Sequence, residues 1–263
     1  MRSYLHDGTP LGLLTALTEA FAGPEGEEIR ILPTGYPPGL FDEIERVTTD
    51  PRRATTFLRH LAGRLPREVL TEVFYCIFAD RPETGTLLWA YLRLLLARGN
   101  EAAEDWTDPR VREARRLAAR IRHEVHLFHG FLRFRRLEDG TYYAAIAPRY
   151  AVLPLLAPHF VARFADQRWF IHDTKRNSGL FYDGRCVHYL PKMNPLSPIA
   201  RPDPMEASYE ELFREYFRLI AIPERKNERL QRQRIPSRYR HFMFELEDHP
   251  SGRVHQTGKF GEI

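Results

Sequence analysis

Cysteine is scarce in this sequence. The 263 residues contain only Cys76 and Cys186. Two cysteines so far apart, each in an apolar setting, form neither a disulfide framework nor a metal-binding motif. We therefore expect buried free thiols and a reducing compartment, the cytoplasm.

The sequence also has no long apolar segment and no familiar nucleotide-binding loop. The N-terminus does not have the pattern of a signal peptide. The longest apolar run, residues 87–99, is interrupted by Arg93, so we expect no membrane span. The stretch Gly35–Gly39 is rich in proline and carries no lysine, and neither a nucleophile elbow nor a dinucleotide fingerprint occurs. These absences argue against a standard nucleotide-dependent enzyme and predict no cofactor, but they leave open whether the protein is an enzyme.

Arginine, by contrast, is concentrated in two segments. Residues 110–136 hold nine arginines and a local net charge of +7, and residues 225–240 carry +6. The whole chain carries +4, so the remainder is acidic, at −9. The planar guanidinium group suits bidentate contacts with phosphates and bases. The clusters therefore favour binding to nucleic acid, while the arginine codons of a GC-rich genome are the competing explanation for the choice of residue.

The hydrophobic pattern predicts an α+β fold, with a helical N-terminal half packed on a small sheet module and a basic C-terminal helix. The N-terminal part, residues 1–107, is expected to be mostly helical. It has an extended stretch at residues 3–6 and one short strand at residues 29–32. Its helices are expected to begin near Pro10, Pro51, Pro66 and Pro82, where proline stands at or just before the first helical position.

Residues 108–191 are expected to form a helix over residues 109–129 followed by a β-β-α-β-β module. The first hairpin turns at Asp139-Gly140, and the crossing helix is expected to be interrupted near Pro158. We expect residues 192–247 to be a Pro-rich linker and a basic C-terminal helix. Within them, residues 208–220 form an amphipathic helix with Leu212, Tyr216 and Leu219 on one side. Residues 248–263 are expected to be a flexible tail.

Three histidines, His123, His126 and His129, recur at spacings of three on the long helix. The helical zinc signature needs two histidines four residues apart with a glutamate between them, so we expect no metal. His126 is the histidine of this set expected to face a binding groove; the alternative is ordinary surface or capping histidines.

The string GFLRFRR, Gly130 to Arg136, alternates arginine with Leu and Phe. On a strand, this alternation would place Arg133 and Arg135 beside Phe131, a combination typical of binding to single strands or flipped bases. The alternative is an edge strand with a solvated arginine face and a buried face.

Residues 159–176 bring histidine, arginine and tryptophan together in a helix and the strand that follows it. His172 and Asp173 are neighbours on a strand and face opposite sides, so they cannot form a catalytic pair with each other. We expect His172, Lys175 and Arg176 to contact ligand; Trp169 is either a stacking platform or a core residue. The arginine-rich segment that ends near Arg240 is expected to contact phosphate or, alternatively, to be a solvated helix on acidic patches.

The side chains expected to contact nucleic acid are thus His126, Arg133, Arg135, His159, Arg163, Trp169, His172, Lys175, Arg176, Arg232, Arg234, Arg238 and Tyr239. Of these, His126, Arg133, His159, Arg163 and Arg176 are expected to line one concave surface. The two arginine-rich segments are expected to converge on one face.

Four strings resemble a bacterial family of DNA-metabolism and DNA-repair proteins that contains a domain of unknown function. They are YLHDGTPLGLLTALTEAF, LAARIRHEVHLFHGFLRFRRLEDGTYYAAIAP, LPLLAPHFVARFADQRWFIHDTKRNSGLFYDG and RQRIPSRYRHF. The resemblance covers about residues 1–242. It implies a DNA-related role beside a radical-SAM protein that acts on DNA, and a similar central domain occurs fused to uracil-DNA glycosylase-like domains. It implies no particular reaction.

Two hypotheses follow. The first is a nucleic-acid-binding accessory protein that presents damaged or modified DNA to a radical-SAM partner. The second is a DNA-processing enzyme in its own right, glycosylase-like or a base-processing hydrolase. Neither hypothesis involves a membrane.

Overall fold

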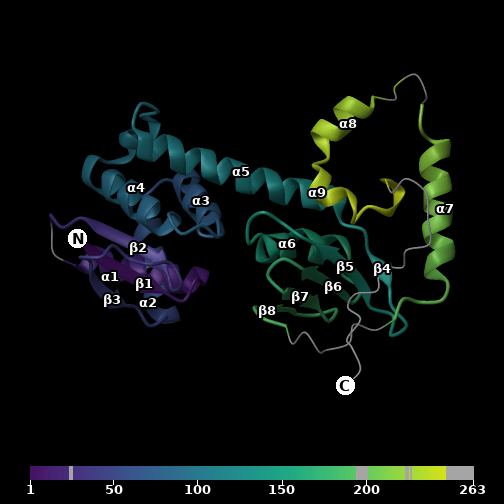
Figure 1. Cartoon of the computed structure of the whole chain (residues 1–263), viewed down its shortest axis with the longest axis horizontal. Helices are drawn as coiled ribbons and strands as arrows, with labels where there is room; N and C mark the ends of the chain where they lie inside the picture. Colours follow the sequence, from purple (N-terminus) through teal and green to yellow (C-terminus); the bar gives the residue numbers. More distant parts are fainter. Residues whose placement is uncertain (24–25, 194–200, 223–224, 226, 247–263) are drawn as a thin grey trace. The chain divides into compact units, whose positions relative to one another are not determined.

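The computed structural model of the chain describes residues 1–23, 26–193, 201–222, 225 and 227–246 and has an α+β fold (Figure 1). Contacts divide the chain into two compact units. The first comprises residues 1–126 with 149–152, and the second comprises the remainder. The long helix α5 (Pro109–Phe131) contributes to both units. The division therefore falls inside a helix, whereas the sequence placed a boundary ahead of it.

The first unit is built on a parallel three-stranded sheet. The strand β1 (Arg2–His6) lies between β2 (Ile29–Pro33) and β3 (Glu43–Arg46) and pairs with both in parallel. The two extended stretches expected from the sequence are β1 and β2. The strand β3 was not foreseen, because its sequence EIER is mostly exposed and shows no apolar alternation.

The helices of the first unit begin where proline and capping residues predict. They are α1 (Pro10–Ala22), α2 (Pro51–Ala62), α3 (Arg67–Cys76) and α4 (Thr84–Arg98). The Thr9 side chain accepts a hydrogen bond from the Gly12 amide and so caps α1. Asp50 caps α2 in the same way. A short 3₁₀ helix, η1 (Asn100–Glu104), separates α4 from α5.

A buried glutamate attaches residues 149–152 to the first unit. The two oxygens of Glu124, a residue that is 4% exposed, accept the backbone N–H groups of Arg149 and Tyr150 at 2.8 and 2.9 Å. The backbone N–H of Ala151 donates to the carbonyl of Phe78 at 2.9 Å. This acidic residue of the arginine-rich helix is therefore structural.

The second unit contains a five-stranded sheet in the order β4-β5-β6-β7-β8. Its strands are β4 (Arg135–Arg136), β5 (Tyr142–Ile146), β6 (Trp169–Asp173), β7 (Ser178–Tyr182) and β8 (Val187–Leu190). The pair β5–β6 is parallel and is joined by the helix α6 (Leu153–Arg163), while the other pairs are antiparallel. The expected β-β-α-β-β order is confirmed, and β8 extends it by one strand.

Two details of this module differ from the sequence prediction. The helix α5 continues to Phe131, so β4 is confined to Arg135 and Arg136, and Phe131 and Arg133 do not share a strand with them. The helix α6 passes through Pro158 without interruption. Pro158 lies in the second turn of α6 and removes only one helical hydrogen bond there.

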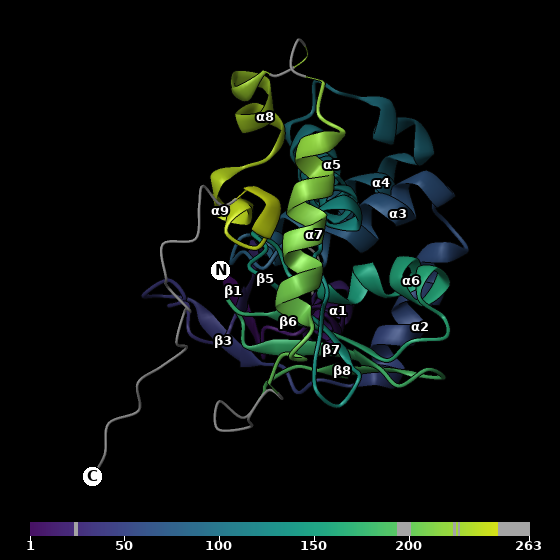
Figure 2. The same ribbon diagram turned by 90° about the vertical axis from the view of Figure 1, so that its right-hand side faces the viewer.

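The C-terminal helices are α7 (Glu206–Leu219), α8 (Glu228–Arg234) and α9 (Ser237–Arg240), followed by the 3₁₀ helix η3 (Phe244–Leu246). Figure 2 shows α7 along its length. The expected helix is present, but its apolar side is open, because Leu212, Tyr216 and Leu219 are 62%, 56% and 77% exposed. Much of the expected linker, residues 194–200, and the expected flexible tail lie outside the described residues.

The two cysteines differ in environment. Cys76 is fully buried, as expected, whereas Cys186 is exposed next to the β7–β8 turn, so the expectation of two buried thiols is wrong for the second. No helix among the described residues is long and apolar enough to cross a membrane.

Candidate nucleic-acid interface

The first unit presents one basic half of α5 to solvent. The opposite half is buried, through residues such as Val111, Ala114 and Ile121. The exposed side chains include Arg116, Arg120, Arg122, His123 and His126. At 100° per residue, these five positions fall within one half of the helix circumference.

The arginines of α5 divide into those with partners among the described residues and those without such partners. Arg110 forms two hydrogen bonds with Asp108, at 3.0 and 2.6 Å. Arg112 donates to two backbone carbonyls. Arg115 forms ion pairs with Glu72 and Glu104 at 3.2 and 2.9 Å.

By contrast, Arg116, Arg120 and Arg122 form no ion pair or hydrogen bond through their guanidinium groups with any described residue. We call these three residues the α5 arginine cluster. Arg116 and Arg120 stand one helical turn apart, about 6 Å along the axis. Unpaired surface guanidinium groups retain their full capacity to bind phosphate.

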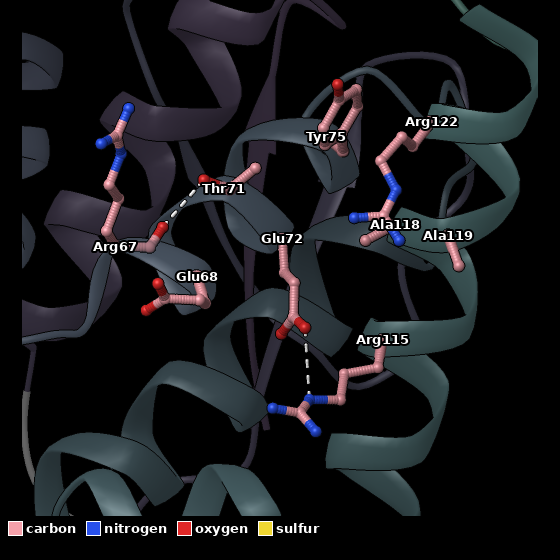
Figure 3. A pocket seen from close by; sticks show the side chains of 9 residues that line it. All are labelled: Arg67, Glu68, Thr71, Glu72, Tyr75, Arg115, Ala118, Ala119 and Arg122. Atoms are coloured by element: carbon pink, nitrogen blue, oxygen red, sulfur yellow. Dashed lines mark hydrogen bonds and ion pairs between the residues drawn. The ribbon is translucent and has the colours of Figure 1, made fainter. Parts of the chain in front are cut away.

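A groove of about 500 Å³ adjoins this cluster between α3 and α5 (Figure 3). Arg67 lies on the α3 side and Arg122 on the α5 side, and Tyr75 also lines the groove. The Arg115–Glu72 ion pair crosses the groove between the two helices, and Glu72 also accepts a hydrogen bond from the Tyr91 hydroxyl at 3.1 Å. The groove therefore combines an aromatic ring with two guanidinium groups that have no carboxylate partner among the described residues.

None of the thirteen residues expected from the sequence lines this groove. The signal that could have found it is the spacing of Arg115 and Arg122, which stand about two helical turns apart on the same side of α5. The side chains expected from this segment, His126, Arg133 and Arg135, lie nearer its C-terminal end.

In the second unit, Arg133 has a structural partner. Its Nε and Nη2 atoms donate to one oxygen of Glu245 at 2.9 and 2.5 Å, and its Nη1 donates to the carbonyl of Gly130 at 2.7 Å. The side chain of Glu245 is 1% exposed. Arg133 therefore neutralises a buried carboxylate and satisfies the end of α5.

Arg176 is held in a similar way. Its Nη1 donates to Asp173, which is fully buried, at 2.9 Å and to the carbonyl of Pro148 at 3.2 Å. Asp173 also accepts the backbone N–H groups of Lys175 and Arg176 at 3.0 and 3.2 Å. These contacts fix the turn between β6 and β7, while the side chain of Lys175 is exposed.

Trp169 is completely buried, so the alternative of a stacking platform is wrong and the core alternative is correct. Its ring packs against Tyr182 at 5.4 Å. Tyr239 is also buried, at 1% exposure, and lies 4.9 Å from Phe128. Neither ring is accessible to a nucleobase.

His159 is stacked on His129, with ring centroids 4.0 Å apart and planes 9° from parallel. Burial, together with the charge of Arg163, lowers the pKa of His159. Arg163 itself is exposed and lies over the ring of Phe164 at 5.6 Å.

His172 lies on the face of the sheet opposite to Asp173, and its Nδ1 is 2.9 Å from the Tyr143 hydroxyl. Burial lowers the pKa of His172 and raises the pKa of Tyr143 to about 12. The strand register aligns one further row of residues across the sheet on this face: Arg135, Tyr143, Phe170, Phe181 and His188. The aromatic neighbour of Arg135 is therefore Tyr143 and not Phe131, and Arg135 is paired with Glu210 at 2.6 Å.

In the C-terminal segment, Arg234 and Arg238 are exposed, and Arg238 lies over the Tyr239 ring at 4.7 Å. The side chain of Arg232 lies outside the described residues. The shared concave surface and the convergence of the two arginine-rich segments stay predictions. Among the residues described, no group of three His, Cys, Asp or Glu side chains could hold a metal ion.

Comparison with known proteins identifies a family for most of the chain. Residues 82–245 match the family model of DUF4130, a domain of unknown function. No curated protein and no solved structure matches the chain.

Proposed function

We propose that this chain, which belongs to the DUF4130 family and whose matched residues include all of α5, is a nucleic-acid-binding accessory protein of DNA metabolism or repair. The observation that carries the proposal is the α5 arginine cluster, Arg116, Arg120 and Arg122. These guanidinium groups have no acidic partner among the described residues, whereas Arg110 and Arg115 of the same helix pair with acidic residues and Arg112 donates to backbone carbonyls. If all the arginines of α5 formed internal ion pairs, the helix would give no support for phosphate binding.

The electrostatics of DNA predict how strongly the α5 arginine cluster should affect the salt dependence of binding. Each phosphate neutralised by a cation releases condensed counterions, so the logarithm of the binding constant falls with the logarithm of salt concentration by about 0.9 per phosphate contact. If each member of the cluster meets one phosphate, their removal lowers the slope by about 2.7. The loss is independent of DNA sequence, because phosphate contacts carry no base information.

The test compares two triple variants with the same change in charge. Arg116→Gln/Arg120→Gln/Arg122→Gln removes the cluster. Arg52→Gln/Arg59→Gln/Arg98→Gln removes three exposed arginines from other helices of the same unit and serves as the control. Fluorescence anisotropy with labelled DNA between 50 and 200 mM salt, roughly the range over which such contacts are most visible, measures both affinity and slope.

We expect the cluster variant to bind DNA much more weakly and with a shallower slope than the control, with both variants equally folded by circular dichroism. Equal affinities and slopes in the two variants would show that the α5 arginine cluster does not contact DNA. Failure of the wild-type protein to bind DNA at low salt would refute the proposed function itself.

The sheet of the second unit suggests what form of DNA is bound. Its row of Tyr143, Phe170, Phe181 and His188 lies on the face opposite to the buried Trp169, and Tyr143, Phe170 and Phe181 are each partly exposed. Aromatic rings on a sheet face stack on unpaired bases, each worth roughly 1–3 kcal/mol. The proposal therefore extends to a preference for single-stranded or locally opened DNA, tested by comparing a single strand with the matching duplex in the same assay.

The resemblance to DNA-repair proteins supports a radical-SAM protein as the partner, to which this chain would present its DNA. A pull-down with a radical-SAM protein of the same organism, with and without DNA, tests this part. Recovery of the partner in neither case would confine the proposal to DNA binding alone.

A further inference from the structure

A second cavity, of about 100 Å³, lies within the first unit at one end of the parallel sheet. His6 is the last residue of β1 and Pro33 the last of β2, and both line the cavity. The helices α1 and α4 begin beside it, and Thr84, the first residue of α4, is also part of its wall. The carboxyl ends of parallel strands are where open α/β sheets bind ligands.

The buried side-chain hydroxyl of Thr84 indicates that the cavity binds a ligand. The residue is 4% exposed, and its hydroxyl oxygen is buried with no hydrogen-bond partner among the described residues. Buried hydroxyl groups nearly always have a partner, because leaving one unpaired is costly. A ligand in the cavity would supply the missing partner.

Two other groups in the wall are donors. The Nδ1 atom of His6 accepts the backbone N–H of Gly8 at 3.1 Å, so the ring proton sits on Nε2 and makes that atom a donor. Burial lowers the pKa of His6 to about 4, so the ring is neutral at pH 7. Arg81 donates to the Tyr150 hydroxyl at 3.2 Å and has no ion pair with a described carboxylate.

The surrounding backbone adds positive potential. The N-terminal turns of α1, a helix of 13 residues, and α4, of 15 residues, both border the cavity, and helix N-termini favour anions. The nearby carboxylate of Asp7 accepts hydrogen bonds from Thr9 and Thr49 at 2.7–2.9 Å. Two further residues of the wall, Tyr36 and Asp80, are exposed and mark its outer rim.

We propose that this cavity binds the phosphoryl group of a phosphate monoester, with the hydroxyl of Thr84, Nε2 of His6 and the guanidinium of Arg81 as donors. The volume corresponds to about three water molecules, which admits a tetrahedral oxyanion but no nucleoside. The organic part of the ligand would therefore lie outside, against Tyr36 and Asp80. This site does not depend on the α5 arginine cluster or on the proposed DNA binding.

The decisive variant is Thr84→Val, which removes the hydroxyl and keeps the shape of the side chain. Because the hydroxyl has no partner among the residues that the structure describes, we expect the variant to have a melting temperature at or above that of the wild type. The matched control is Thr18→Val in α1, whose hydroxyl is already bonded to the Leu14 carbonyl at 2.8 Å. Calorimetric titration and thermal melting are run on the full chain with three kinds of probe.

The probes are inorganic phosphate, a deoxynucleoside 5′-monophosphate beside the same deoxynucleoside, and an oligonucleotide with a 5′-phosphate beside one with a 5′-hydroxyl. We expect the monophosphate, but not the nucleoside, to raise the melting temperature of the wild type and of Thr18→Val. We expect Thr84→Val to bind it at least tenfold more weakly. The oligonucleotide pair then distinguishes a free nucleotide from a DNA end as the source of the phosphate.

Three results would overturn the proposal. They are no response of the wild type to phosphate or the monophosphate, equal binding of nucleoside and monophosphate, and unchanged binding by Thr84→Val. A loss of DNA binding in the α5 cluster variant with intact monophosphate binding would leave this site in place.

Discussion

Arg176 was expected from the sequence to contact DNA, and the structure gives it a different partner that can be tested directly. Its side chain is 17% exposed and pairs at 2.9 Å with Asp173, whose side chain is 0% exposed. Replacing Arg176 by Gln leaves a buried carboxylate without its cation. Such a loss costs roughly 3–5 kcal/mol. We expect the lower end, about 3 kcal/mol, because Asp173 keeps two backbone N–H donors.

For a domain of this size, 1 kcal/mol corresponds to about 2–4 °C in melting temperature, so Arg176→Gln should lower it by roughly 6–12 °C. Near-ultraviolet circular dichroism during heating measures the change. The matched control is Arg163→Gln, the same substitution at an exposed arginine of the same unit, which should alter stability by less than about 0.5 kcal/mol.

The double variant Asp173→Asn/Arg176→Gln separates charge from shape. Asparagine still accepts the two backbone N–H groups but carries no buried charge, so the double variant should be more stable than Arg176→Gln alone. DNA affinity of the folded protein should be the same in Arg176→Gln and in the double variant as in the wild type. A normal melting temperature in Arg176→Gln together with weakened DNA binding would refute the structural role and restore the DNA contact.

Three further outcomes are expected. Burial lowers the pKa of His6 from 6.5 to about 4. The neutral ring therefore contributes fully to the free energy of unfolding above pH 6.5, and this contribution is lost as the pH falls toward 4. Unfolding titrations should show a loss of up to about 3 kcal/mol in this window that His6→Gln removes. A thiol reagent should label Cys186 rapidly in the native protein and Cys76 only after unfolding, since Cys76 is buried and burial raises its pKa to about 12; rapid labelling of both would contradict the burial. Gly85→Ala should be strongly destabilised in thermal melting, because an added Cβ would lie 2.6–2.7 Å from atoms of Ile31; a wild-type melting temperature would show that α4 can shift.

The sequence predicted the starts of helices well because their cause is local. A cap such as Asp50 followed by proline satisfies backbone donors within three residues, whatever the rest of the chain does. The pairing of strands was harder to predict from the sequence. The parallel pairing of β1 with β2 joins residues 27 positions apart (Arg2 and Ile29), and its pairing with β3 joins residues 41 positions apart (Arg2 and Glu43). The strand β3 also has almost no apolar pattern.

The candidate site was predicted less well, because the sequence shows charges but not their partners. Arg133 and Arg120 carry the same charge in the same basic segment. The first meets buried Glu245, 112 residues away, and the second meets no described carboxylate. Only the fold separates an arginine that stabilises the protein from one that is available to a ligand. The same reasoning explains Trp169, which begins β6, the central strand of the five-stranded sheet, and is buried there.

The open helix α7 has a consequence for how salt acts on the second unit. None of its residues is buried, and charged contacts hold much of it, including Arg135–Glu210 at 2.6 Å and a hydrogen bond from the Arg136 amide to Glu206. Exposed ion pairs weaken as ionic strength rises, whereas the buried core is little affected. The free energy of local opening of α7 therefore falls with salt, and its amides exchange with solvent hydrogen sooner than those of the sheet. Salt thus tunes the order of one helix of this protein without unfolding the rest.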